Sequence, residues 1–427
     1  MNKIILLILT FLSQIAFAGL QEQADFICSQ VIEKPNFKAE DHFSKSFLAR
    51  VDYNRLVSIF QNIYADDGTC KKAAIYSNLP LLSKVELTTN TAHQRLRLSF
   101  DENGLITSLL YDGRDKSHIR VNDINSIPQT LNQLGGISSV KVYDLTNQRS
   151  VYDYKSNERL ALGSEFKLYV LSYLNDLILN KKMSWSDQIA LQDDLKSLPS
   201  GKMWQLPAGT QFSLQQYAEN MISISDNTAT DHLINLLGRQ NIQNSMVGFN
   251  SYLQDNSPLM TTMDMFRSRT LKEDQVNQYV QSNESDRLLI LDNLKKSMSF
   301  NEVAEKLSDW SQPRYINKME WFASTDDICK TISKIKIQAD QDKTIYDILS
   351  KNTPFIWTEK DQNFSYAGYK GGSEEGVITM TYLLKLKNQK WICLSMGVND
   401  ENQNLNDTLV FDTFQAILNY FGEELGK

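Results

Sequence analysis

Three short segments of the chain carry the side chains that a serine acyl-transfer site needs. They read S-E-F-K at residues 164–167, S-D-N at 225–227 and K-G-G-S at 370–373. In this order they supply a hydroxyl, an amine three residues later, a second hydroxyl and a second amine. Because a serine hydroxyl is a poor nucleophile at neutral pH, it needs a neighbouring base. The set predicts a serine nucleophile activated by a lysine, without a histidine-based triad.

The first segment favours Ser164 as the nucleophile. Residues 166–179 are strongly apolar and follow an extended stretch, so we expect Ser164 to open a buried helix. Residues three apart share a helix face, which puts Lys167 beside the hydroxyl. A lysine acts as a base only where burial or other cations lower its pKa. The S-x-x-K pattern also occurs at Ser138 and Ser333, so the apolar flank, rather than the pattern, selects Ser164.

The second segment lies in a polar loop between two helical stretches. There the hydroxyl of Ser225 can pass a proton to a leaving group, and the amide of Asn227 can orient a substrate carbonyl. Taken alone, such a tripeptide is more often a turn that caps a helix. Both roles therefore depend on the other two segments.

The third segment ends a predicted strand. Lys370 supplies the second amine, and Gly371 and Gly372 let a substrate approach the backbone closely. The backbone N–H of Ser373 would complete an oxyanion hole with the N–H of Ser164, at a helix N-terminus. The alternative is a plain hairpin turn, which is the commoner use of a Lys-Gly-Gly sequence.

Residues 1–18 are typical of a secretory signal peptide. Lys3 gives a positively charged start, residues 4–11 form a short apolar run, and A-F-A at 16–18 is a cleavage site. The run is too short to span a membrane, which takes about 20 residues. We expect cleavage after Ala18 and a periplasmic or secreted protein without stable membrane insertion. The alternative is a buried N-terminal helix.

Composition excludes several classes of function. The net charge is -7 and no basic stripe is present, so the chain is a poor partner for nucleic acid or an anionic membrane. The four histidines lack metal-ligand spacing, and we expect no metal and no cofactor, only a small-molecule substrate. Export permits disulfides. We expect Cys28 to pair with Cys70, while the pairing of Cys329 and Cys393 stays open.

The length of 427 residues suggests about two or three domains. Residues 19–112 predict a small α+β domain, with helical spacing over 42–64 and then alternating strands around an Asn-Gly turn at 103–104. A polar linker is expected at 113–126. The rest of the chain, 127–427, forms the second domain.

Strand patterns stand at both ends of this second domain, around a helix-rich middle at 164–351. We expect an antiparallel sheet with an all-helical subdomain inserted into it, which makes the fold α+β with two domains. Residues 268–312 are polar and helix-prone, and we expect solvated helices there. The predicted strands cover 140–145, 150–154, 365–370, 377–386 and 391–398, and a closing helix covers 409–425.

These segments carry a resemblance to a known family. Residues 127–427 resemble the class A β-lactamase and penicillin-recognising serine hydrolase family, whose elements S-x-x-K, S-D-N and K-T-G come in this order. The likeness extends beyond the triplets, from L-P-S-G at 198–201 to the stretch 221–231. The resemblance implies a β-lactamase-like α/β domain and a covalent acyl-enzyme.

The resemblance also implies a role for each candidate residue. Ser164 would be the acylated nucleophile and Lys167 its base. Ser225 would relay the proton, Asn227 would position the substrate, and Lys370 would hold the substrate carboxylate or tune Ser225.

Two departures from the family pattern bear on activity. The third element reads Lys-Gly-Gly, so a hydroxyl that would help to bind the substrate carboxylate is missing at Gly371, and Ser373 or another group must compensate. The family's deacylating glutamate, in an E-x-x-x-N loop, has no counterpart between Leu233 and Thr261, where Asp255 is the only carboxylate. We read Asp255 as a cap or a solvated turn and expect easy acylation with slow deacylation.

Residues 19–112 resemble the cystatin-like, steroid-isomerase-like units that precede the hydrolase domain in serine hydrolases of clavulanate biosynthesis clusters; the alternative is a generic accessory domain. The leading hypothesis is an exported serine hydrolase that acts on a β-lactam or a related amide or ester. Two other functions stay open: an esterase or cell-wall peptide hydrolase on the same fold, and a binding protein with a vestigial site.

Overall fold

The computed structural model describes residues 20–49, 51–78, 83–101, 103–114, 119–198, 200–308, 310–351, 354 and 363–427. The predicted signal peptide lies outside these residues. Backbone contacts divide the chain into two compact units, residues 1–120 and 121–427. The domain limits predicted from the sequence, at 112 and 126, stay predictions. No helix in the described part of the chain combines the length and the apolar character that a membrane span requires.

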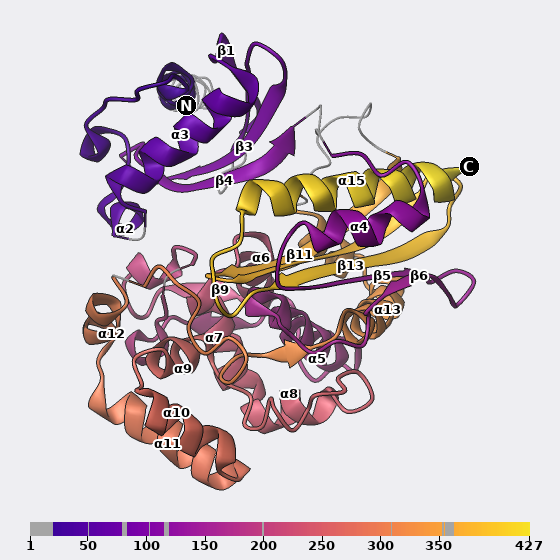
Figure 1. Ribbon diagram of the computed structural model, residues 1–427. Coiled ribbons are helices and arrows are strands. Elements are labelled where there is room, and N and C mark those ends of the chain that lie inside the picture. Colours follow the sequence, from indigo (N-terminus) through magenta and orange to yellow (C-terminus); the bar gives the residue numbers. More distant parts are fainter. Residues whose placement is uncertain are drawn as a thin grey trace, which may run out of the picture. The chain divides into compact units, whose positions relative to one another are not determined.

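The first unit is an antiparallel sheet of four strands in sequence order, packed against helices (Figure 1). The helical pattern at 42–64 is interrupted, because extended Asp52 accepts a hydrogen bond from the backbone N–H of Arg55 and starts a new helix. A disulfide joins Cys28, in the helix at 20–30, to Cys70. The elements are η1 (Ala39–Asp41), α2 (Lys45–Leu48), α3 (Tyr53–Asp67), β1 (Lys72–Asn78), β2 (Ser83–Thr88), β3 (His93–Phe100) and β4 (Ile106–Arg114).

The second unit is built on a five-stranded antiparallel sheet in the order β11-β12-β13-β5-β6. Strands from both ends of this unit therefore pair, and the helices lie between them in sequence, as the sequence pattern predicts. The strands of the sheet are β5 (Ile137–Asp144), β6 (Arg149–Tyr154), β11 (Phe364–Glu374), β12 (Val377–Leu386) and β13 (Trp391–Asn399). Two small sheets pair β7 (Leu160–Ala161) with β10 (Phe322–Ala323) and β8 (Gln188–Ala190) with β9 (Gln211–Ser213).

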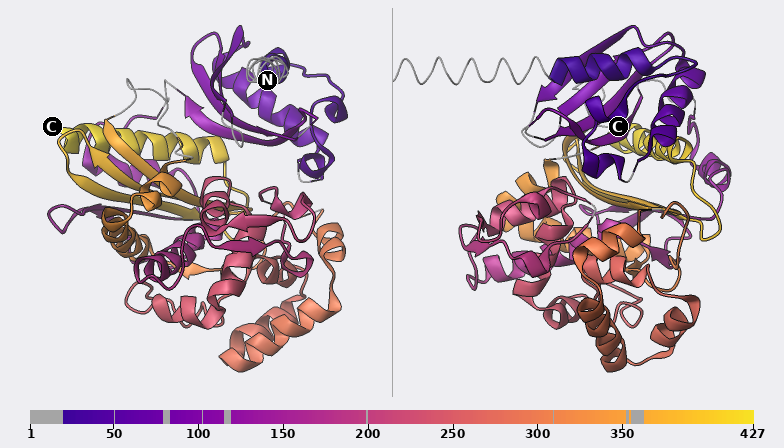
Figure 2. Two further views of the ribbon diagram at one scale, coloured as in Figure 1. Left: turned by 180° about the vertical axis from the view of Figure 1, so that it is seen from behind. Right: turned by 90° about the vertical axis from the view of Figure 1, so that its left-hand side faces the viewer.

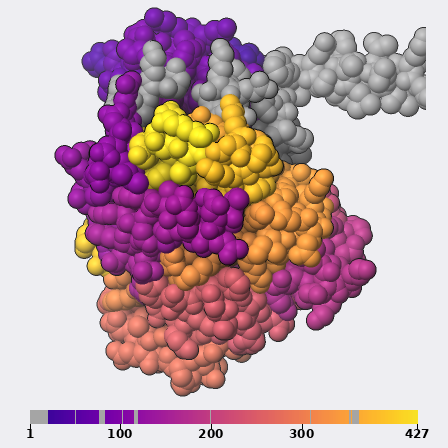
Figure 3. Space-filling model, turned by 90° about the vertical axis from the view of Figure 1, so that its right-hand side faces the viewer, coloured from indigo at the N-terminus to yellow at the C-terminus, as the bar shows by residue number. Residues whose placement is uncertain are grey.

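Helices cover both faces of the five-stranded sheet (Figure 1). On one face lie α4 (Ile127–Asn132) and the closing helix α15 (Asp407–Gly426), which is drawn in yellow at the surface of this unit in Figure 3. On the other face lie α5 (Lys167–Leu179) and α13 (Thr325–Gln341). A second disulfide, Cys329–Cys393, ties α13 to the central strand β13 and answers the pairing that the sequence left open.

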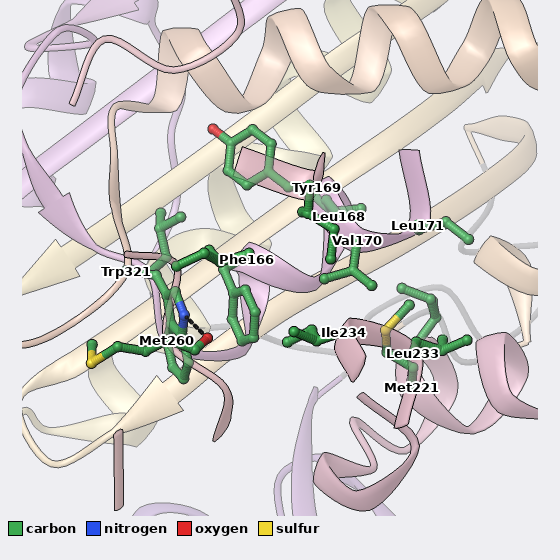
Figure 4. Packing of buried hydrophobic residues seen from close by; sticks show 14 of the residues in the cluster. Phe166, Leu168, Tyr169, Val170, Leu171, Met221, Leu233, Ile234, Met260 and Trp321 are labelled. Atoms are coloured by element: carbon green, nitrogen blue, oxygen red, sulfur yellow. Dashed lines mark hydrogen bonds between the residues drawn. The ribbon is translucent and has the colours of Figure 1, made fainter. Parts of the chain in front are cut away.

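The helices of the unit share a hydrophobic core, to which α5 contributes several fully buried residues. Figure 4 shows Phe166 stacked on Trp321, whose ring centroids are 3.8 Å apart, and the indole N–H of Trp321 donating to the carbonyl of Met260. Hydrophobic contacts of this kind fix the first turn of α5 against the segment that leads into β10. The turn just before α5, where Ser164 lies, is thus held by packing contacts.

The remaining helices surround this core. The hairpin of α10 and α11 extends away from the sheet (Figure 2), and most of its side chains are partly or fully exposed, as expected for the polar stretch at 268–312. The first two residues of that stretch, Ser268 and Arg269, are instead fully buried. The elements are η2 (Ile124–Ser126), η3 (Gly163–Phe166), η4 (Asp193–Leu195), η5 (Met203–Gln205), α6 (Leu214–Ser223), α7 (Asn227–Leu237), α8 (Arg239–Ser245), α9 (Thr262–Ser268), α10 (Glu273–Gln281), α11 (Glu284–Ser297), α12 (Phe300–Lys306) and α14 (Thr344–Ser350).

Candidate active site

Ser164 lies in the 3-10 turn η3, which leads directly into α5. The turn is possible because Gly163 takes a positive φ of 51°, a conformation that other residues rarely adopt. Ser164 is half-buried, whereas Gly163 and Glu165 on either side of it are buried. Its hydroxyl makes no hydrogen bond within the described part of the chain, so the oxygen is available to a substrate.

Lys167 brings its amine to the S-D-N loop. Its Nζ lies 2.7 Å from the carbonyl oxygen of Ser225, 3.1 Å from Ser225 Oγ and 2.6 Å from Asn227 Oδ1. Among the described residues it makes no hydrogen bond to Ser164, although the i,i+3 spacing predicts that the two side chains are neighbours. Three oxygens of the loop instead satisfy this fully buried amine.

The S-D-N loop is held in an unusual conformation. Ser225 has a φ of 56°, which is strained for a residue with a side chain. Asp226, which is buried, fixes the loop by accepting hydrogen bonds from the backbone N–H groups of Lys202, Met203 and Ala229. The amide of Asn227 donates to the carbonyl of Leu198 at 2.6 Å. Strain of this kind persists only where the surroundings determine the conformation, and it aims Ser225 Oγ at the two lysines.

Lys370 reaches the same hydroxyl from strand β11. Its Nζ donates to Ser225 Oγ at 3.1 Å and also to the carbonyl of Gly371. The three predicted segments therefore meet at one atom, with an amine from α5 and an amine from β11 on either side of it. Lys370 and Ser225 are 145 residues apart in sequence, so only the tertiary fold brings them together.

The glycines after Lys370 let β11 press against the turn that carries Ser164. A Cβ atom at Gly372 would lie 2.0 Å from the carbonyl oxygen of Leu162 and 2.7 Å from the backbone nitrogen of Ser164. Thr379 of β12 links the two by accepting from the N–H of Gly372 and donating to the carbonyl of Leu162. A side chain at 372 would push β11 away from the turn that carries Ser164.

Gly371 explains the departure from Lys-Thr-Gly. A Cβ atom at this position would lie 2.1 Å from the hydroxyl oxygen of Tyr369 and 2.6 Å from the carbonyl oxygen of Thr379. Threonine therefore does not fit at 371, and the hydroxyl of Tyr369 stands where its side chain would begin. Ser373, the other predicted residue of this segment, is exposed next to the turn that carries Ser164, and its backbone nitrogen lies 3.2 Å from where a Cβ atom of Gly163 would be.

Burial controls the charge of the two lysines. It lowers the pKa of Lys167 well below the usual lysine value, and the positive charge of Lys370 lowers it further. Burial also lowers the pKa of Lys370, to about 7, although the carboxylate of Glu165 partly opposes this. Both amines can therefore exist without a proton near neutral pH, which is the state that a base requires.

Glu165, between Ser164 and Lys167 in the first motif, is a site residue that sequence reasoning missed. Its side chain is buried, and burial raises the pKa of its carboxyl to about 8. It lies against Thr379 and Thr381 of β12 and interacts with the charge of Lys370. The sequence does offer a signal, because a glutamate next to an apolar run of 14 residues must be either exposed or specially accommodated.

Asp255, the carboxylate singled out in the sequence, lies in the loop after α8 and is not part of this arrangement. It is 41% exposed and forms an ion pair with Arg159, with 2.6 Å between Oδ2 and Nε. This agrees with its interpretation as a solvated turn residue. The described residues also hold no cluster of three or more histidines, cysteines, aspartates or glutamates that could bind a metal ion.

Comparison with known proteins gives the family. No curated protein sequence matches the chain. Solved structures that superpose on it include a β-lactamase from Sphaerobacter thermophilus, with 16% sequence identity, a TM-score of 0.49 and an alignment that covers 71% of this chain and 98% of that chain. A β-lactamase from Chitinophaga pinensis superposes with 14% sequence identity, a TM-score of 0.49 and the same coverage of 71% and 98%. A β-lactamase from Francisella tularensis superposes with 17% sequence identity and a TM-score of 0.47, and the alignment covers 71% of this chain and 100% of that chain.

A sequence model of the Beta-lactamase enzyme family, Beta-lactamase2, matches residues 121–355, which is more than half of the chain and includes the first two motifs. This chain belongs to the beta-lactamase enzyme family.

Proposed function

We propose that the protein is an exported serine hydrolase that forms an acyl-enzyme on Ser164 with a β-lactam or a related amide or ester. One observation carries the proposal: two buried lysines with lowered pKa values meet at the hydroxyl of Ser225, beside a serine with an unengaged oxygen. A structural lysine would instead be expected to face a carboxylate that keeps it charged.

In the proposed acylation, uncharged Lys167 takes the proton of Ser164 while Oγ bonds to the substrate carbonyl carbon. The backbone N–H groups of Ser164 and Ser373 would stabilise the oxyanion that forms. The C–N or C–O bond of the substrate then breaks. The leaving group receives the proton of Ser225, and Ser225 regains one from Lys167. Lys370, where protonated, would attract a substrate carboxylate.

Slow deacylation is part of the proposal. A water molecule must lose a proton to attack the acyl-enzyme, and the two buried carboxyls next to Ser164 in space or sequence are poor bases. Burial raises the pKa of Glu165 to about 8, and burial together with a second carboxyl raises that of Glu320. Glu165 is therefore mostly protonated at neutral pH, the raised pKa of Glu320 favours its protonated form, and Asp255 is engaged with Arg159 at the surface.

The proposal is tested by incubating the protein with a fluorescent penicillin and, separately, with a chromogenic ester, followed by intact mass measurement. We expect a gain of one acyl group per chain that persists for minutes or longer. The adduct should be absent in Ser164→Ala and present in Ser333→Ala, a matched control from the unrelated S-x-x-K on α13. Absence of both adduct and turnover with every reagent would contradict the proposal, and an adduct that survives in Ser164→Ala would contradict the assignment of the nucleophile.

The two reagents also separate the substrate classes. Labelling by the ester alone would favour an esterase over an enzyme directed at β-lactams. For the first unit we propose an accessory role of the steroid-isomerase-like kind, supported by its α+β content and its position before the hydrolase domain. Its removal should leave acylation of small reagents by the second unit intact if that role is binding rather than catalysis.

A further inference from the structure

A buried ionic cluster lies next to the candidate site, and the mechanism above makes no use of it. It consists of Arg269, at the end of α9, Glu320, just before β10, and Glu374, the last residue of β11. The Arg269 and Glu320 side chains are fully buried, and that of Glu374 is 8% exposed. We call these three residues the carboxyl clamp.

The clamp holds three separate segments together. Nη2 of Arg269 donates to Glu320 Oε1 at 3.0 Å and to Glu374 Oε1 at 2.8 Å, and Nη1 donates to the carbonyl of Met319. Arg269 also lies over the ring of Trp310, 5.5 Å from its centroid. Such a planar cation with several donors fixes the relative positions of its acceptors better than a single-point contact does.

The clamp also contacts both walls of the candidate oxyanion hole. Oε2 of Glu320 accepts from the backbone N–H of Gly163, at 3.3 Å, and from that of Trp321, at 2.9 Å. Gly163 immediately precedes Ser164, and Glu374 immediately follows Ser373. The two N–H groups that would stabilise an oxyanion are therefore each one residue away from a contact of the clamp.

Charge balance in this buried place requires a proton. Two carboxyls face one guanidinium, and the next residue of the chain, Glu375, which lies in the turn after β11, adds a further negative charge near Glu374. The Glu320 and Glu374 carboxyls both accept from Nη2 of Arg269, so two negative charges there would repel each other at close range. Burial and the charge of Glu374 raise the pKa of Glu320 well above its usual value, and burial raises the pKa of Glu374 too, so the pair favours holding a proton.

We propose that Arg269, Glu320 and Glu374 form a positioning clamp that sets the spacing between the N–H groups of Ser164 and Ser373, and that it does so with one proton shared by the two carboxyls. The inference rests on the proposed acyl-transfer function of Ser164. None of the three residues touches the substrate in this scheme. They act through the backbone on either side of the oxyanion hole.

The test compares two substitutions of Glu320 with the wild type. Glu320→Gln keeps the shape and the acceptor for Gly163 but cannot lose a proton, so acylation by the fluorescent penicillin at pH 7 should stay within about threefold of wild type. Glu320→Ala removes the acceptor, and the acylation rate constant should fall about 100-fold while the dissociation constant before acylation changes little, because misplaced catalytic groups cost about that much. Lys141→Met, which removes another buried cation with two carboxylates in the same unit, should acylate normally.

Either of two results would overturn the proposal: full activity in Glu320→Ala, or an equal loss in Glu320→Gln. A second measurement covers the case in which Glu320→Ala does not fold. Amide hydrogen exchange of the peptide at 160–166 is compared between wild type and Glu320→Gln at pH 7 and pH 10. Loss of the shared proton should speed exchange at pH 10 in the wild type only, and identical rates in the two proteins would contradict the proposal.

This second measurement needs no substrate. If neither a penicillin nor an ester labels the wild-type protein, the proposed function is contradicted. The exchange comparison would still decide whether the clamp holds this part of the backbone. The two failures can therefore be told apart.

Discussion

Two lysines stand in one row across the central sheet, and their surroundings differ. Lys370 on β11 pairs in register with Thr381 on β12, which pairs with Ser395 on β13, which pairs with Lys141 on β5. Directly paired residues lie on the same face of a sheet, so both lysines start from the same face. Both side chains are also almost completely shielded from solvent.

The pKa values of the two lysines are nevertheless shifted in opposite directions. Burial opposes the charge of Lys141, but hydrogen bonds to Asp153 and Asp326 outweigh it and raise the pKa of that lysine. Lys370 faces only the carboxyl of Glu165, which is itself buried and has a raised pKa, and burial lowers the pKa of Lys370 to about 7. Burial alone does not set the charge of a lysine side chain. What matters is whether its carboxylate partner stays hydrated enough to remain ionised.

The row therefore has two different ends. We call Lys141 with its two aspartates the structural end and Lys370 with Glu165 the chemical end. At the structural end, ionised partners hold the cation permanently, and the pair contributes to stability. At the chemical end, the weak partner leaves the amine able to gain and lose a proton near neutral pH. A group that titrates near the working pH is the kind that acid–base chemistry uses.

The largest expected effect comes from replacing each lysine with methionine, which keeps most of the side-chain volume. Lys370→Met should lower the rate constant for acylation by an anionic fluorescent penicillin by about 100-fold or more, because a charge that attracts the substrate and a contact to Ser225 are both lost. Lys141→Met should acylate within about threefold of wild type. Equal losses in the two variants, measured by the time course of fluorescent labelling, would show that the two ends of the row are not distinct.

A smaller effect is expected when the partner of Lys370 is changed. Where the carboxyl of Glu165 has lost its proton, its negative charge favours the ammonium form of Lys370, so Glu165→Gln should lower the pKa of that lysine. The affinity for an anionic substrate, which is highest where Lys370 is protonated, should then fall off at a lower pH than the wild-type midpoint of about 7. A neutral ester should show no such shift.

The comparison is measured as the pH dependence of the dissociation constant before acylation, for the penicillin and for the ester. Glu165→Asp, which keeps the charge, serves as the matched control and should stay closer to wild type. An unchanged profile in Glu165→Gln would mean that Glu165 does not influence Lys370.

The contrast between the two ends also marks where sequence reasoning reached and where it stopped. Strand alternation and the apolar run after Ser164 have local signatures, so the sheet at the C-terminal end and the position of α5 could be predicted. The three motifs could be recognised from their residue types and their order. Their detailed contacts could not be predicted, since Lys167 contacts the S-D-N loop rather than Ser164 itself.

The buried charges had no comparable signature. A glutamate such as Glu320 normally marks a solvated position, and its partners Arg269 and Glu374 are 51 and 54 residues away along the chain. Only the tertiary fold pairs them. The disulfide between Cys329 and Cys393 is similar, because a helix and a strand that are 64 residues apart give no local sign of being neighbours. The break at Asp52 is a different case: a capping residue was present, but the apolar spacing on both sides concealed it.

The smallest expected effect concerns stability and its dependence on pH. The pKa values of Asp153 and Asp326 are lowered by hydrogen bonds to lysines, although burial opposes this. Groups with lowered pKa values stabilise the fold above their unfolded pKa, near 3.8, and this contribution is lost as the pH falls through their folded values. Lys141, whose pKa is raised, contributes below its unfolded value of 10.5 and ceases to contribute only at still higher pH.

Lys141→Met should therefore reduce the free energy of unfolding by about 1–2 kcal/mol at pH 7, less than a fully buried pair would lose because Asp153 is half exposed. The penalty should be constant from about pH 5 to 9 and should shrink below about pH 3, where wild type has lost the same interaction. Urea unfolding of both proteins at pH 7 and pH 2.5 measures it. A penalty of equal size at the two pH values would mean that methionine disturbs packing rather than charge, and the structural end of the row would then owe its stability to shape instead of ion pairing.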